Sequence, residues 1–187
     1  MGNDHDGDQK IRQDLLKLVA AQFLSFALGL NAETLKSALV APNFNDPNVL
    51  LTLIFLFSWL SFFLGIHFFV SQPPVSVGVR QIDLTATLIT LALLVFLGAT
   101  ATTQTKTTFI WLLFGLYAFE TVWDYGRKIY LSRSQPRLLS SFPRFWYWCD
   151  PLLAALTGLF LIFSWLPLWG LGVIHFAYAV LTLCKLL

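Results

Sequence analysis

The chain has 187 residues, of which 57% are hydrophobic and only 12% are Asp, Glu, Lys or Arg, and its formal net charge is +2. So small a charge, with no basic stripe interleaved with aromatic residues, excludes a nucleic-acid-binding protein, and the apolar excess excludes an ordinary soluble domain. We therefore expect an acidic, polar cytoplasmic tail over residues 1–13 and a single transmembrane helical domain over residues 14–187.

Long uncharged stretches indicate helices that span a membrane. Residues 47–79, 84–105 and 151–184 carry no formal charge, and a helix needs roughly 20 apolar residues to cross a bilayer. The apolar residues come in blocks and do not alternate, which favours helices over a β-barrel. The expected fold is an all-α integral membrane protein, a bundle of six or alternatively five transmembrane helices with no soluble domain. The predicted spans are residues 14–30, 49–70, 84–103, 107–123, 146–166 and 168–187.

The first segment, residues 14–30, decides between six spans and five. Because it contains Lys17 and Gln22, it either crosses the membrane with a polar stripe towards its neighbours or lies on the surface. With six spans and both termini in the cytoplasm, all twelve basic residues except Lys36 and Lys106 lie inside, as the positive-inside rule requires. With five spans they divide almost evenly. We favour six spans in a bacterial inner (plasma) membrane, with a short helix over residues 32–40 in an outer loop.

The span at residues 107–123 carries an ionisable stripe. Tyr117, Glu120, Asp124 and Lys128 recur at spacings of three and four, so they share one helical face. Glu120 and Asp124 are like charges that need a proton or a neighbouring cation. The candidate cations are Arg80, Arg127 and Arg144. Three interpretations stay open: a structural ion-pair belt, a proton- or cation-responsive gate and, with least support, a catalytic carboxylate pair.

The stretch from Tyr125 to Arg144 is predicted to be the only sizeable cytoplasmic surface, a basic loop broken by Pro136 and Pro143. Its basic residues are Arg127, Lys128, Arg133, Arg137 and Arg144. Such a loop either contacts anionic lipid headgroups or docks an acidic soluble partner.

Small residues predict where helices pack closely. Ser61 with Gly65, and Ala154 with Gly158, have the small-xxx-small spacing that lets helices approach, within a chain or between chains. We expect the Gly158 face to carry assembly, because glycine allows the closest approach.

Neither the histidines nor the cysteines predict a cofactor or a metal site. His67 and His175 fall at different depths, so we expect each to hydrogen-bond to backbone or Ser/Thr groups within a helix interface. Cys149 and Cys184 lie far apart without a CxxC spacing. Apart from His175, the ionisable residues at membrane level are expected at the cytoplasmic edge, which disfavours a solute carrier with a site near the midplane.

Function follows from the sequence only in outline. The leading hypothesis is a non-enzymatic polytopic membrane subunit. It acts either as a homo-oligomer or as the membrane anchor or effector arm of a cytoplasmic partner. By analogy, a stress- or phage-defence system is one setting for such a subunit. The alternative is a small oligomeric ion or proton channel with Glu120 and Asp124 around an acidic inner mouth. A lipid-modifying enzyme ranks third, because Asp, His and Ser do not cluster in a motif. The lipid bilayer itself is the one partner common to all three.

Overall fold

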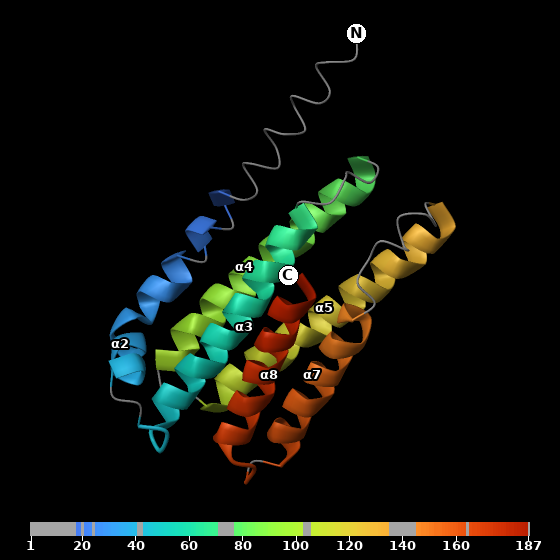
Figure 1. Ribbon diagram of the computed structural model, residues 1–187. Coiled ribbons are helices and arrows are strands. Elements are labelled where there is room, and N and C mark those ends of the chain that lie inside the picture. Colours follow the sequence, from blue (N-terminus) through green and yellow to red (C-terminus); the bar gives the residue numbers. More distant parts are fainter. Residues whose placement is uncertain are drawn as a thin grey trace.

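The described part of the chain, seen in a computed structural model, consists of helices joined by turns (Figure 1). The structure describes residues 18–186 apart from 20, 24, 41–42, 71–76, 103–105, 135–144 and 164. The helices are α2 (Ala32–Val40), α3 (Pro47–Val70), α4 (Val77–Thr102), α5 (Lys106–Ser134), α7 (Trp146–Ile162) and α8 (Leu168–Leu186). An apolar helical segment, Ala21–Leu30, precedes them. Since no strand occurs in these residues, the prediction of an all-α fold is confirmed for them.

Most helix boundaries fall close to those predicted, and α2 covers the short helix predicted over residues 32–40. α4 begins at Val77 and not at residue 84, because the last prolines before it are Pro73 and Pro74. α7 ends at Ile162 and not at residue 166, since the chain turns ahead of Pro167.

The prediction of a basic loop after residue 125 is wrong for its first part. α5 runs on to Ser134, because no proline interrupts the sequence before Pro136. Arg127, Lys128 and Arg133 therefore lie on a helix. The remaining basic residues of the predicted loop, Arg137 and Arg144, lie outside the described residues.

Local polar contacts fix the turn that leads into α3. The side chain of Asn43 accepts a hydrogen bond from the backbone N–H of Asn45 at 3.2 Å. Asp46 then caps α3, because its Oδ1 accepts from the N–H of Asn48 at 2.9 Å and Pro47 occupies the first helical position, where no N–H is needed.

The helices pack in a ring. α5 lies along α7 and α3 lies along α8, while α4 connects α3 to α5 and α2 rests on α3. α7 and α8 are neighbours in sequence, joined by a tight turn around Pro167, yet they touch each other far less than they touch α5 and α3. We call this joint the α7–α8 seam; Figure 1 shows the two helices side by side above their shared turn.

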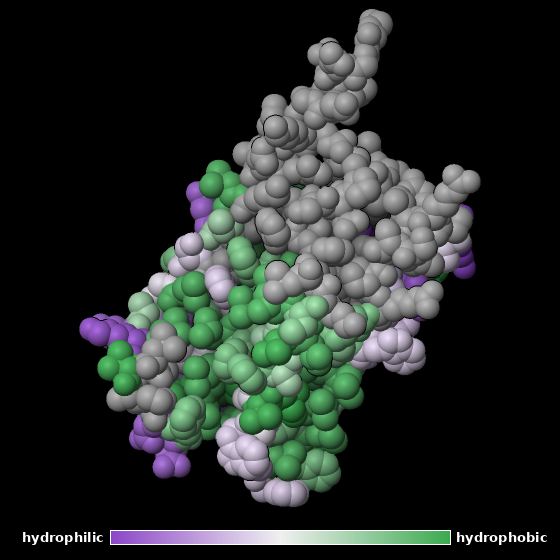
Figure 2. Space-filling model, in the orientation of Figure 1, coloured by the Kyte–Doolittle hydropathy of each residue, from purple (hydrophilic) through white to green (hydrophobic). Residues whose placement is uncertain are grey.

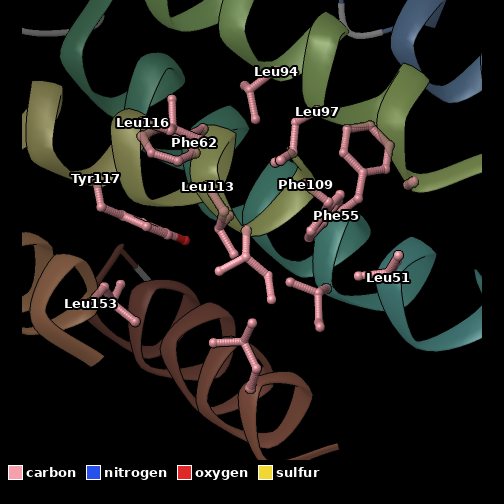
Figure 3. Packing of buried hydrophobic residues seen from close by; sticks show 14 of the residues in the cluster. Leu51, Phe55, Phe62, Leu94, Leu97, Phe109, Leu113, Leu116, Tyr117 and Leu153 are labelled. Carbon is pink, nitrogen blue, oxygen red and sulfur yellow. The ribbon is translucent and has the colours of Figure 1, made fainter. Parts of the chain in front are cut away.

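The centre of the bundle is filled by aliphatic and aromatic side chains from α3, α4, α5, α7 and α8 (Figure 3). Those drawn and labelled are Leu51, Phe55, Phe62, Leu94, Leu97, Phe109, Leu113, Leu116, Tyr117 and Leu153. Tyr117 has no exposed surface, and its hydroxyl is the polar group among these labelled side chains.

Large apolar side chains also cover much of the outside (Figure 2). Phe96 of α4, Trp111 and Val122 of α5, Ile162 of α7 and Val173 of α8 are each more than half exposed. Two helical stretches are long and apolar enough to cross a membrane, Pro47–Gly65 and Leu84–Ala101. Shorter apolar stretches are Tyr147–Ile162 and Leu168–Cys184. Length and composition thus support two of the six expected spans.

Candidate functional site: a buried polar cluster at one end of the bundle

The ionisable stripe of α5 faces the interior over most of its length. Tyr117 and Asp124 are buried and Glu120 is half-buried. Lys128 is exposed, and its ammonium lies 5.6 Å from the ring centroid of Tyr125 and 5.0 Å from that of Tyr147. The stripe therefore starts in the core at Tyr117 and reaches the surface at Lys128, where the cation rests on two aromatic faces.

A hydroxyl from the neighbouring helix binds Glu120. The Oγ1 of Thr90 on α4 donates a hydrogen bond to Glu120 Oε1, and no basic side chain contacts Glu120 within the described part of the chain. Of the cations proposed for it, the Arg80 side chain and Arg144 lie outside what the structure describes.

A second carboxyl, Asp150 of α7, lies inside the bundle and is only 4% exposed. Its Oδ1 accepts a hydrogen bond of 3.0 Å from the hydroxyl of Tyr178 on α8. The Tyr178 ring meets that of Tyr117 edge to face, with centroids 6.2 Å apart, and the Tyr117 hydroxyl contacts Ser58 Oγ at 3.3 Å. Hydroxyls and rings thus connect α7, α8, α5 and α3 through the interior.

His175 of α8 packs against this chain of groups and has no exposed surface. Its ring centroid is 5.5 Å from that of Tyr117, and its Nδ1 lies 2.8 Å from the carbonyl oxygen of Leu171, so the prediction of a backbone hydrogen bond within a helix interface is confirmed. Because a carbonyl only accepts, Nδ1 carries the proton, and in the neutral ring Nε2 is then an acceptor. Nε2 is buried and has no partner among the described atoms. The side chain of His67 is outside the described residues.

Acidic groups dominate the field inside this end of the bundle. Glu120 and Asp124 both act electrostatically on Asp150. Arg127 is buried on the same helix as the first two, and it and Asp124 both act on the hydroxyl of Tyr147. Arg133 is exposed. In the described part of the chain, no group of three or more His, Cys, Asp or Glu side chains is arranged to hold a metal ion.

One of the predicted packing residues lies against another helix of the same chain. Gly158 faces Phe114 of α5, whose Cε2 would lie 3.4 Å from an added Cβ. Ser61 is buried and its hydroxyl donates to the carbonyl of Phe57 at 2.9 Å. Gly65 and Ala154 are half-buried. Gly158 thus lets α7 approach α5 within the chain. That the Gly158 face also carries assembly between chains stays a prediction.

The buried carboxyl groups lie in one half of the bundle. Asp150 is near the start of α7, Glu120 and Asp124 are in the second half of α5, and α7 runs antiparallel to both α5 and α8 (Figure 1). In the other half, the described interior consists of apolar side chains with a few neutral polar ones, such as Asn31 and Thr52. The polar cluster is therefore one-sided.

Sequence reasoning missed Thr90, Tyr178 and the central place of Asp150. A signal for Tyr178 and His175 was present, since Leu171, His175, Tyr178 and Thr182 lie on one face of α8 at spacings of three and four. Nothing in the sequence alone pairs that face with Asp150 or Thr90 with Glu120.

The sequence matches no family model, and no curated protein or solved structure matches it. The chemistry of this cluster and of the surface is therefore the basis for assigning a function.

Proposed function

We propose that this chain is a multi-pass membrane protein without catalytic chemistry of its own, a membrane subunit that anchors a cytoplasmic partner at the basic end of α5. The observation that carries the proposal is an apolar outer surface together with polar groups that are buried in the interior. Carboxyls, hydroxyls and an imidazole lie inside, whereas Phe96, Trp111, Ile162 and Val173 are on the outside. A soluble bundle would gain nothing from this distribution, but a bundle surrounded by lipid requires it.

Aromatic side chains support the same reading. Trp148 and Trp165 are each about three-quarters exposed, at 74% and 77%, and they mark the two ends of α7. The 17 residues of α7 rise about 26 Å, close to the thickness of a hydrocarbon core, and tryptophan favours both lipid–water boundaries. We place α7 and α8 across the membrane, together with α3, α4, α5 and the segment ending at Leu30, with both termini on the side of the basic residues.

The extra length of α5 supplies the docking element. Its 29 residues rise about 44 Å, roughly 14 Å more than a bilayer core. The last turns present exposed Lys128 and Arg133 beside exposed Ile129 and Tyr130. Basic charge beside exposed apolar side chains on a rigid helix suits an acidic partner surface that also offers apolar contacts.

The channel alternative receives less support. A conducting path needs polar groups through the whole bundle, whereas the described interior of the other half holds no Asp, Glu, Lys or Arg side chain. The cluster is open to hydration from one side at most.

The anchor proposal is tested by the native mass of the chain purified in mild detergent from its own host. We expect a complex heavier than the monomer, containing a second protein at fixed stoichiometry. The double variant Lys128→Glu/Arg133→Glu should lose that protein while keeping its helical content, and the matched control Lys36→Glu, at the opposite end, should retain it. A monomer with no second protein, or equal retention by both variants, would overturn the proposal.

A further inference from the structure

The hydrogen-bonding groups around Asp150 and His175 contain more acceptors than donors. The Tyr178 hydroxyl is used on Asp150, and that of Tyr117 on Ser58. The Ser58 hydroxyl is used on the carbonyl of Ile54 at 2.9 Å, and the Nδ1 proton of His175 on Leu171. With Asp150 ionised, every donor in this group is therefore occupied.

Acceptor capacity remains on two side chains that are at least nine-tenths buried. Nε2 of His175 has no partner among the described atoms, and Asp150 has one hydroxyl partner for a carboxyl with about four lone-pair sites. No basic side chain contacts Asp150 in the described part of the chain. A buried acceptor left unmatched costs about 1–3 kcal/mol, so the site favours an occupant that brings donors and positive charge.

The orientation of His175 directs its free nitrogen into the bundle. Nδ1 points back to the carbonyl of its own helix, and Nε2, on the other side of the ring, is buried. The ring of Tyr117 lies against it. Tyr178, one turn along, stacks on Phe145 with centroids 6.1 Å apart. Aromatic faces thus accompany the free acceptors, as in sites that bind organic cations.

We propose that the interior at the α7–α8 seam binds an organic ammonium ion, the head of an amine-bearing amphiphile, with its N–H groups on Asp150 and His175 Nε2. The apolar tail would leave between α7 and α8, which pack mainly on other helices. Binding requires neither the cytoplasmic partner nor the basic end of α5, so its failure would leave the anchor proposal standing.

Three probes of equal chain length separate charge from hydrogen bonding. Octylammonium carries a charge and three N–H donors, octyltrimethylammonium carries the charge without donors, and 1-octanol carries one donor without charge. The assay is calorimetric titration of the full chain in phosphatidylcholine nanodiscs, with empty nanodiscs subtracted. We expect saturable binding of octylammonium at least tenfold tighter than that of either other probe. Equal binding of all three, or no saturable binding, would overturn the proposal.

Variants test the assigned residues. Asp150→Asn keeps the shape and removes the charge, and His175→Phe keeps a ring and removes the acceptor; each should weaken octylammonium at least tenfold. Glu33→Gln, an exposed acid on α2, should bind like the parent. If Asp150→Asn does not fold, Tyr178→Phe takes its place, because losing the hydroxyl that competes for Asp150 should leave affinity unchanged or higher. Parent-like affinity in Asp150→Asn, or a tenfold loss in Tyr178→Phe, would contradict the assignment.

Discussion

Gly98 of α4 and Gly115 of α5 make a matched pair for testing the packing. Both lie inside helices, so replacing either by alanine gains the same helix propensity, about 1 kcal/mol. Their surroundings differ. A Cβ at Gly98 would lie 2.9 Å from Asn31 Nδ2 and 3.2 Å from Phe55 Cζ, whereas nothing lies within 4 Å of one at Gly115. Asn31 cannot swing away easily, because it is 1% exposed and its amide donates to the carbonyl of Ala27 at 3.0 Å.

The magnitude follows from these contacts. Ordinary carbon contacts lie at about 3.5–4.0 Å, and forcing an extra carbon into a packed core costs about 1–3 kcal/mol. The free energy of unfolding of Gly98→Ala should therefore be about 1–3 kcal/mol lower than that of Gly115→Ala. The gain in helix propensity is common to both variants and cancels in this difference. Thermal unfolding in detergent, followed by circular dichroism, measures the difference, with Tm shifting by about 2–4 °C per kcal/mol for a chain of this size. Equal stability of the two variants would refute the packing of Asn31 against α4.

Two further predictions concern the polar cluster and the topology. Thr90→Val removes the hydroxyl that binds Glu120 and should lower the free energy of unfolding by about 1 kcal/mol. The control Thr108→Val, at an exposed position of α5, should change it by less than about 0.5 kcal/mol. Equal losses of the two variants in chemical denaturation would contradict the role of Thr90. In a chain whose two native cysteines are replaced by serine, Lys36→Cys should react with a membrane-impermeant thiol reagent in intact cells and Arg133→Cys should not, and the reverse pattern would invert the proposed topology.

How far the sequence predicts this molecule depends on the range of the interactions involved. Helix α2 and the stripe of α5 follow from local spacing, which a helix converts directly into a shared face. The predicted end of α5 is too early, because a run of basic residues suggests a loop although no helix breaker precedes Pro136. The meeting of Asp150 with Tyr178, and of Glu120 with Thr90, depends on which helices pack together. Hydrophobic blocks carry no information about that choice, because one apolar face packs about as well as another.

The ring of helices also sets an order of assembly. In a chain made from its N-terminus, α3, α4 and α5 can associate as neighbours, and α7 then settles on α5. Only α8 closes the ring, and it packs against α3, which lies far back in the sequence. Ile54 lies 3.8 Å from the position of a Cβ at Gly172, and the rings of Phe57 and Phe176 meet edge to face with centroids 5.2 Å apart. Until that contact forms, one flank of α3 lacks its neighbouring helix and Asp150 lacks the hydroxyl of Tyr178. In the proposed membrane setting, a product truncated before α8 would leave Asp150 without the Tyr178 hydroxyl that binds it, a feature by which quality control would tell an unfinished molecule from a finished one.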